Sequence, residues 1–258
     1  MAPVSTAAES RHIGEGEGTP ETEWLGWPAI GALPRISLDD LLPAGSRAVV
    51  VAPHPDDEVL SVGGLLAELA ARRHAVSIVA VTDGDASHPG SGLWSPEALA
   101  AVRRAETLAA VNRLGFGPDV ICRLGVPDGG VSAATDQLAS RLAMHMTAND
   151  VVFSTWRLDG HPDHEATALA CAAAVAEVGA RLVEVPVWAW HWARPDDRRW
   201  PWDHARRLDL SPQAQRNKSL AVQAFRSQLE PDPSTGAAPI LRNSTVARAA
   251  RPFEVMFL

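Results

Sequence analysis

The chain has 258 residues, of which 46% are hydrophobic, so it can form one large domain or two small ones with an apolar core and without disulfide bonds. Its formal net charge is −8 at pH 7 and its basic residues are scattered, which argues against nucleic acid as the main partner. A neutral or positively charged ligand agrees better with this charge. The two cysteines, Cys122 and Cys171, are expected to be small buried side chains in a reduced, cytoplasmic protein.

The beginning of the chain differs in composition from the rest. Residues 1–23 lack the basic start and apolar core of a secretory signal, and we expect a flexible tail there. Residues 24–258 are expected to form a single domain. No window of the chain approaches the roughly 20 apolar residues that a membrane helix needs, so no membrane insertion is expected.

From residue 47 on, apolar segments alternate with helical patterns. The expected strands are 47–53, 75–82, 119–125, 150–155, 181–192 and 252–258. The expected helices are 59–73, 96–115, 134–147, 163–178 and 211–228. Short apolar strands separated by amphipathic helices predict a mostly parallel sheet with right-handed crossovers and helices on both faces. The predicted fold class is therefore α/β, a Rossmann-like doubly wound sheet.

Two similar motifs follow the first and the fourth expected strands. The string "HPDDE" at 54–58 comes directly after the first strand, and "DGHPDHE" at 159–165 comes after the fourth. In the common doubly wound order these two strands are neighbours at the point where the strand order reverses, and ligands bind beyond their carboxyl ends. The two motifs are therefore expected to form one site.

The residue types in the two motifs are those of a metal centre. Histidine and carboxylate are favourable zinc ligands, and a catalytic zinc usually has three protein ligands and a water. His54 and Asp57 are three residues apart on a turn that opens a helix, and so are His161 and His164. One metal needs a single ligand from the second pair, which leaves residues for a general base and an oxyanion donor.

Each of these residues also has a simpler interpretation. An acid at a helix N-terminus is often a cap worth about 1 kcal/mol, and Asp56 and Asp163 both suit that role. A lone histidine at a strand end is more often structural or exposed than a metal ligand. Because His-Pro-Asp occurs at the ends of two strands that are expected to be adjacent, the sequence favours a metal site over both interpretations.

Together, "APHPDDEVL" and "DGHPDHEA" resemble the LmbE-like or PIG-L family of zinc-dependent deacetylases, which remove acetyl groups from N-acetylglucosamine-type sugars in glycolipids, thiol precursors and antibiotics. The segments "VTDGD", "RRAETLAAVNRLG", "LGVPDGG" and "KSLAVQAFRSQ" also resemble the family, so the resemblance covers most of the chain. It implies that His54, Asp57 and His164 bind Zn²⁺ and that Asp56 is the general base. His161 would face the substrate carbonyl or the leaving nitrogen.

The implied mechanism uses a metal-activated water. Zinc lowers the pKa of its water from about 15.7 towards about 7, and Asp56 would take the remaining proton. The oxyanion formed at the acetyl carbonyl would be held by zinc and His161, where one lost donor typically costs about 3 to 4 kcal/mol. Either Asp56 or His161 would then protonate the leaving amine.

Arg103, Asp128 and Asp85 are the expected substrate-binding residues. Arg103 has an alternative, an ordinary intrahelical ion pair with Glu106 one turn away. Asp128 lies in "VPDGG", which is first of all a turn signal, and the resemblance makes it a candidate for sugar hydroxyls. Asp85, in the long loop after the second strand, is a candidate for the same role. Some family members use a tyrosine near the metal, and this chain has no tyrosine.

The sequence therefore predicts a zinc-dependent amide hydrolase that acts on a small-molecule N-acyl amino sugar conjugate. Another divalent transition metal such as iron or cobalt is an alternative cofactor. An amidase that cuts a larger sugar-thiol or antibiotic-type amide with the same site is an alternative function. A non-catalytic sugar- or nucleotide-binding domain is a second one, although no G-x-G-x-x-G string follows the first strand. The sequence does not indicate an oligomeric state.

Overall fold

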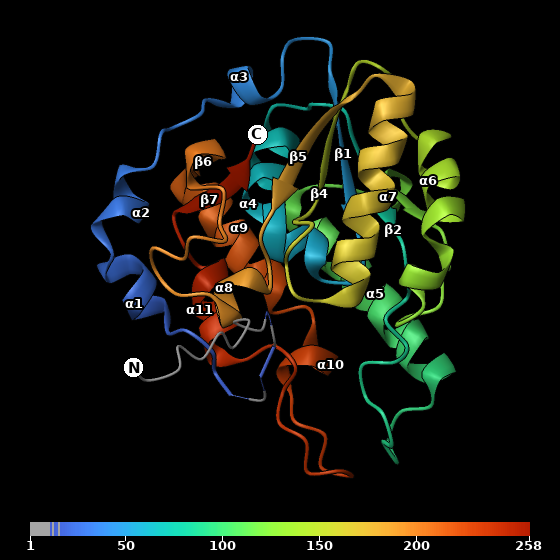
Figure 1. Ribbon diagram of the computed structural model, residues 1–258. Coiled ribbons are helices and arrows are strands. Elements are labelled where there is room, and N and C mark those ends of the chain that lie inside the picture. Colours follow the sequence, from blue (N-terminus) through green and yellow to red (C-terminus); the bar gives the residue numbers. More distant parts are fainter. Residues whose placement is uncertain (1–10, 12, 15) are drawn as a thin grey trace, which may run out of the picture.

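The computed structural model describes residues 11, 13, 14 and 16–258. Its strands form one seven-stranded sheet in the order β3-β2-β1-β4-β5-β7-β6 (Figure 1). The strands are β1 (Arg47–Ala52), β2 (Val76–Ala80), β3 (Ile121–Arg123), β4 (Asp150–Thr155), β5 (Arg181–Val185), β6 (Ala205–Asp209) and β7 (Phe253–Phe257). The α-helices are α1 (Glu21–Gly26), α2 (Pro28–Ala32), α3 (Leu38–Leu41), α4 (Asp57–Ala71), α5 (Pro96–Leu114), α6 (Thr135–Ala143), α7 (Pro162–Val178), α8 (Ala189–Trp192), α9 (Pro212–Val222), α10 (Arg226–Leu229) and α11 (Asn243–Ala249).

Five neighbouring strands of the sheet are parallel. β1 pairs in parallel with β2 and β4, and β3 and β5 extend the sheet in parallel on either side. β7 is antiparallel to both β5 and β6. The predicted mostly parallel α/β fold is therefore confirmed. The strand order reverses between β1 and β4, so the carboxyl ends of these two strands lie side by side, as the sequence predicted.

The central strand β1 is buried on both faces, which explains its unbroken apolar sequence. Ala48 and Val50 pack into a cluster with α4, α5 and α9, whereas Val49 and Val51 pack with α6 and α7 on the opposite face. Full burial of each such valine contributes about 1.5–3 kcal/mol, so both helical layers are held to the same strand. The end of β1 is consequently rigid, and it sets the position of the turn at 53–56 that follows.

The strand predicted over 181–192 is shorter in the structure. β5 ends at Val185, and the segment then turns into the short helix α8. The reason is tertiary packing, because Trp190 leaves the sheet and lies against the rings of Trp24 and Trp200, with ring centroids 4.8 and 4.6 Å away. A separate aromatic cluster, to which α1 and α2 contribute, thus takes the place of a longer strand.

The C-terminal part contains two further differences from the sequence prediction. The helix predicted over 211–228 is divided into α9 and α10, and the break at Phe225 places this fully buried side chain in the core. Strand β6 was not predicted, because "ARRLD" at 205–209 has no apolar run. It lies at the edge of the sheet, where charged side chains remain in contact with water.

Part of the tail predicted over residues 1–23, namely residues 1–10, 12 and 15, lies outside the described residues. The described part from residue 16 on contacts the domain. Thr19 is buried and donates two hydrogen bonds to the backbone of the α8 segment, and Glu21 binds the buried Arg251 through two contacts of 2.6 and 2.7 Å. None of the described helices has the length and apolar character needed to cross a membrane.

Helix α4, which carries the first motif at its start, is bent near its middle. At Val62 the backbone has φ −132° and ψ 26°, so the helix restarts there. The first N–H groups after a helix start have no carbonyl partner within the helix and need one elsewhere. The carboxylate of Glu254 on β7 accepts from the N–H of Gly64 at 2.7 Å and of Leu65 at 2.9 Å. A Cβ at position 64 would press against the methyl groups of Leu210, so glycine here allows α4 to approach that side chain closely.

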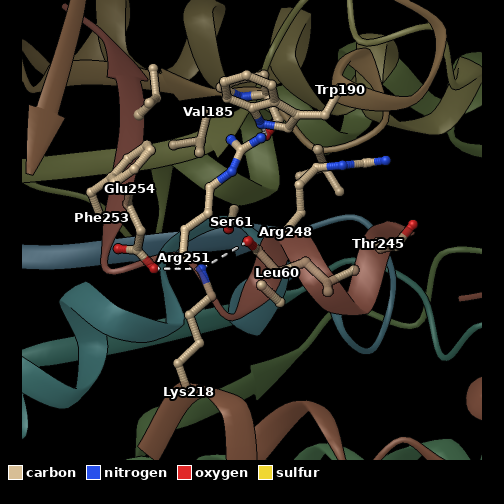
Figure 2. Close-up of a pocket in the computed structure, with 14 residues that line it drawn as sticks. Leu60, Ser61, Val185, Trp190, Lys218, Thr245, Arg248, Arg251, Phe253 and Glu254 are labelled. Carbon is tan, nitrogen blue, oxygen red and sulfur yellow. Dashed lines mark hydrogen bonds and ion pairs between the residues drawn. The ribbon is translucent and has the colours of Figure 1, made fainter. Parts of the chain in front are cut away.

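A buried lysine completes the contacts at the bend. Lys218 Nζ on α9 donates to the carbonyl of Leu60 at 3.1 Å and to Glu254 Oε1 at 2.6 Å (Figure 2). Lys218 and Glu254 are each only 4% exposed, so the pair neutralises two buried charges and satisfies backbone groups on both sides of the bend. It thereby fixes the direction of the first turn of α4.

The substitution Lys218→Met is expected to lower the free energy of unfolding by about 3–5 kcal/mol, because Glu254 would remain buried and without its cation. Urea denaturation followed by circular dichroism measures this loss. The matched control is Arg226→Ala, which breaks an exposed ion pair with Glu230 and should leave the midpoint unchanged. A Lys218→Met protein with the wild-type midpoint would contradict the proposed importance of the buried pair.

Candidate metal centre

The two sequence motifs meet at the carboxyl ends of β1 and β4. Residues 53–56 form a tight turn between β1 and α4, and residues 156–161 connect β4 to α7. Because β1 and β4 are paired in parallel, both turns lie at the same edge of the sheet, and both helices start there. The structure therefore brings together the residues that the sequence assigned to one site.

Three side-chain atoms from the two motifs form a close triangle. His54 Nδ1 lies 3.2 Å from Asp57 Oδ2 and 3.2 Å from His164 Nε2, and the last two atoms are 3.1 Å apart. A tetrahedral zinc with bonds of about 2.1 Å places its ligand atoms about 3.4 Å apart. These two nitrogens and one oxygen, on side chains that are at most 10% exposed, therefore fit a zinc-type ion.

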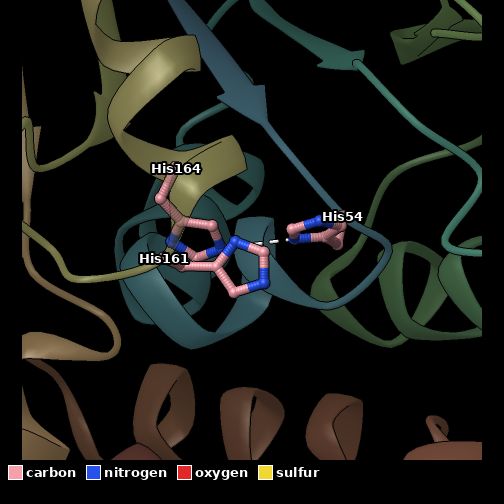
Figure 3. Close-up of side chains that lie close together, drawn as sticks. All are labelled: His54, His161 and His164. Carbon is pink, nitrogen blue, oxygen red and sulfur yellow. Dashed lines mark hydrogen bonds between the residues drawn. The ribbon is translucent and has the colours of Figure 1, made fainter. Parts of the chain in front are cut away.

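His161 lies beside this triangle. Figure 3 shows its ring next to those of His54 and His164, and its ring centroid is 4.8 Å from each of theirs. One nitrogen from each of the three histidines forms a second group of atoms, all within 4.8 Å of one another. His161 also caps α7, because its Nδ1 accepts from the N–H of Asp163 at 3.2 Å.

Asp56 occupies an unusual backbone conformation at the start of α4. Its φ is 127° and its ψ is −28°, a sparsely populated region that costs a residue with a side chain about 1–3 kcal/mol. The interpretation of Asp56 as a helix cap is wrong, because its side chain makes no capping hydrogen bond. Asp163 does not cap its helix either, since its carboxylate accepts from the N–H groups of Gly129 and Val131.

Arg103 is buried and holds Asp56 in place. Its Nη2 lies 3.2 Å from Asp56 Oδ2 and donates to the carbonyl of Pro55 at 2.6 Å, while its Nη1 donates to the carbonyl of Gly84 at 2.9 Å. The alternative intrahelical pair with Glu106 does not form, because Glu106 accepts from Ser227. The guanidinium of Arg103 therefore connects two loops at the site and is only 3% exposed.

The two other residues expected to bind substrate lie on the loops after β2 and β3. Asp128 Oδ1 is 3.1 Å from His54 Nε2, and Asp128 Oδ2 accepts from the N–H of Ala86 at 2.9 Å. Asp163 Oδ2 lies 3.3 Å from the same His54 nitrogen. The ring of His54 is thus held by carboxylates on the side away from the triangle. Asp85 is half-buried in the loop after β2.

Asp159 was missed as a functional residue by the sequence reasoning. It is fully buried, and its Oδ2 lies 2.8 Å from His164 Nδ1. The available signal was its position, two residues before "HPDH" and shortly after a strand end. Sequence alone offered no reason to assign it a role, because an Asp-Gly pair first of all indicates a turn.

Burial and neighbouring charge shift the two adjacent acids of the metal-free site in opposite directions. Burial raises the pKa of Asp56 to about 7, and the charge of Asp57 adds to this effect while Arg103 opposes it. Burial also acts to raise the pKa of Asp57, but His164 and His54 hold that pKa well below its usual range. The residue within the triangle is therefore the one that stays charged.

The two histidines of the second motif also differ. Burial acts to lower the pKa of His164, but the adjacent Asp57 and Asp159 raise it to about 9. Burial lowers the pKa of His161 to about 4, and the charges of His164 and His54 contribute to that shift. His161 is therefore a neutral imidazole near pH 7, which is able to donate or accept a hydrogen bond.

Comparisons with known proteins show which proteins this chain resembles. Residues 49–175 match the family model PIG-L, GlcNAc-PI de-N-acetylase. A 1D-myo-inositol 2-acetamido-2-deoxy-alpha-D-glucopyranoside deacetylase from Corynebacterium glutamicum is 48% identical over 42 residues, which are 16% of this chain and 14% of the relative. The aligned segment thus spans only a small part of that relative.

Two solved structures share the fold over most of both chains. The conserved protein TT1542 from Thermus thermophilus is 28% identical, with a TM-score of 0.53 over 72% of this chain and 80% of that protein. The A40926 pseudoaglycone deacetylase Dbv21 is 26% identical, with a TM-score of 0.59 over 82% of this chain and 96% of that protein. The family match includes both motifs of the metal centre, so residues 49–175 of the chain are similar to the PIG-L family.

Proposed function

We propose that this protein is a metal-dependent amide hydrolase that removes an acyl group from an N-acetylglucosamine-type amino sugar conjugate. The observation that carries the proposal is the triangle of His54 Nδ1, Asp57 Oδ2 and His164 Nε2, with sides of 3.1 to 3.2 Å. Two nitrogens and one carboxylate oxygen leave a fourth position open, which is the arrangement of hydrolytic zinc sites. The family description, a de-N-acetylase, supports the same reaction class.

Zn²⁺ is the proposed ion, held by His54, Asp57 and His164. When bound at such a site, zinc supplies a Lewis acid and lowers the pKa of a water from about 15.7 to about 7. Iron or cobalt would use the same ligands. The contacts of His54 with Asp128 and Asp163 support this assignment, because a metal-binding histidine commonly has a carboxylate partner on its other nitrogen.

The chain supplies a group for proton transfer and a hydrogen-bond donor. Asp56 is the last residue of the turn that carries His54, is not part of the triangle, and is held in a strained conformation by Arg103. We assign it the general base, which takes a proton from the attacking water. His161 lies beside the triangle as a half-buried neutral ring and would donate a hydrogen bond to the developing oxyanion. Asp56, once it has taken the proton of the water, would pass it to the leaving amine.

The substrate is proposed to be a small molecule with an N-acyl amino sugar. Support comes from the two deacetylases similar to this chain, one acting on an inositol glycoside of acetamidoglucose and one on an antibiotic pseudoaglycone. Because the second relative acts on an antibiotic, a larger antibiotic-type amide stays an alternative substrate. Asp85 is the candidate for binding sugar hydroxyls, since Asp128 and Arg103 already bind other groups of the site.

A cytoplasmic location of the protein stays a prediction.

The substitution Asp56→Asn is expected to lower amine release from N-acetylglucosamine conjugates by about 10²–10⁴-fold, because an amide cannot accept the proton of water. A fluorogenic amine assay with zinc-reconstituted protein measures the rate, and metal analysis should give the same zinc content as wild type. The control Asp83→Asn changes an acid that pairs with Arg104 and Arg123 and should keep the wild-type rate. Equal binding of sugar and zinc with no hydrolysis by wild type would favour the binding-domain alternative.

Zinc removal tests the proposed cofactor. Chelation of wild type should abolish hydrolysis, and one equivalent of zinc should restore it. Free zinc at about 100 times its Kd should also raise the free energy of unfolding by about 2.7 kcal/mol, which differential scanning calorimetry detects. Asp57→Asn should show neither effect, because it removes the charged ligand. Full activity of a protein that metal analysis shows to be free of metal would refute this part of the proposal.

The substitution His161→Asn tests whether Asp57 or His161 is the third metal ligand beside His54 and His164. Asparagine can still cap α7, so the fold should be kept, while kcat should fall by about 10²–10³-fold through loss of an oxyanion donor. Zinc affinity, measured by competition with a chromophoric chelator, should stay within a few-fold of wild type. The control is His145→Asn at a histidine outside the site. If His161→Asn instead loses zinc, then His161 and not Asp57 completes the ligand set.

A further inference from the structure

We propose that Asp159 is a positioning residue that fixes the ring of His164 for metal binding and connects it to the loop after β5. This inference rests on the metal site proposed above and extends it to a residue outside the ligand set. Asp159 lies in the turn between β4 and α7, is fully buried, and contacts His164 on the nitrogen that faces away from the triangle.

All acceptor positions of the Asp159 carboxylate are used. Its Oδ1 accepts from the N–H of Val187 at 2.8 Å and of Ala189 at 2.9 Å. Its Oδ2 accepts from the N–H of Trp188 at 2.9 Å and lies 2.8 Å from His164 Nδ1. An ionised carboxylate only accepts hydrogen bonds, so the fourth contact requires Nδ1 of His164 to carry the hydrogen.

This hydrogen bond decides which nitrogen of His164 is free for the metal. With Nδ1 as donor, the neutral ring has its lone pair on Nε2, the atom that lies 3.1 Å from Asp57 Oδ2 and 3.2 Å from His54 Nδ1. The three backbone donors hold the carboxylate, and the carboxylate holds the ring. The orientation of His164 therefore depends on the loop at 187–189 as well as on its own helix.

The backbone of the turn that carries Asp159 is also fixed by a contact with α8. Its carbonyl accepts from Trp192 Nε1 on α8 at 2.7 Å. The next residue, Gly160, has φ +92°, and a Cβ there would lie 2.6 Å from the same Trp192 nitrogen. The α8 segment thus holds Asp159 through both its side chain and its backbone. These contacts together fix the orientation of the carboxylate.

Asparagine has nearly the same shape as aspartate but cannot satisfy these four donors. One oxygen of the carboxylate becomes an NH₂ group, which then faces two N–H groups. If the NH₂ faces Val187 and Ala189, the loop loses two hydrogen bonds. If it faces Trp188 and His164, it favours the tautomer of His164 with the hydrogen on Nε2, which cannot bind a metal through that atom. Both orientations weaken the site without changing a ligand.

The test measures zinc binding rather than hydrolysis. Metal-free wild type and Asp159→Asn are titrated with zinc in competition with a chromophoric chelator, and the variant is expected to bind about 10–100-fold more weakly. The matched control is Thr155→Val. Thr155 Oγ1 donates to the backbone carbonyl of His164 at 3.0 Å and is buried, so the control removes a hydrogen bond to the same residue but leaves its ring untouched.

Urea denaturation of the metal-free proteins separates positioning from stability. The expected result is that both variants lose stability and only Asp159→Asn loses zinc affinity. Two-bond ¹H–¹⁵N spectra of the zinc-loaded wild type should show the hydrogen of His164 on Nδ1. Equal zinc affinity of Asp159→Asn and wild type overturns the inference, and so does a loss of affinity shared by Thr155→Val. If wild type binds no zinc at all, the proposed metal site fails first and this inference fails with it.

Discussion

Buried charge at the carboxyl ends of β1 and β4 is the constraint on which the rest of the structure depends. His54, Asp57, Asp159, Asp163 and His164 are each less than 10% exposed, and charges in such surroundings are stable only when each has partners. The contacts described above supply those partners through alternating histidines and carboxylates, with backbone N–H groups at the ends of the network. A cation in the triangle of donor atoms would complete the balance of a site that is rich in carboxylates.

The surrounding fold holds this network from several sides. The bend in α4 is fixed by Lys218 and Glu254, which belong to the C-terminal part of the chain, so the first turn of α4 depends on late-sequence residues. Arg103 on α5 holds the strained turn at Asp56. The loop after β5 reaches the second motif through Asp159. Helices and loops from different parts of the chain therefore converge on one edge of the sheet.

This arrangement agrees with hydrolysis better than with binding alone. A binding domain has no need for an acid held in a backbone conformation that costs about 1–3 kcal/mol, and strain of this kind is concentrated at functional sites. A fold alone does not determine a reaction, so the functional assignment rests on the donor atoms and on Asp56 rather than on the sheet. The family match, which covers both motifs, supports the same interpretation.

The sequence by itself determined the α/β class, the adjacency of the first and fourth strands, and the residues that meet in the site. These features depend on local patterns, because apolar runs, helical spacing and a repeated His-Pro-Asp string are visible without coordinates. The end of β5 at Val185, the break before Phe225 and the partners of Arg103, Asp128 and Asp159 were decided only by the tertiary structure. The physical reason is that these contacts join residues far apart in the chain, and the cost of burying each charge or ring depends on which distant group packs against it.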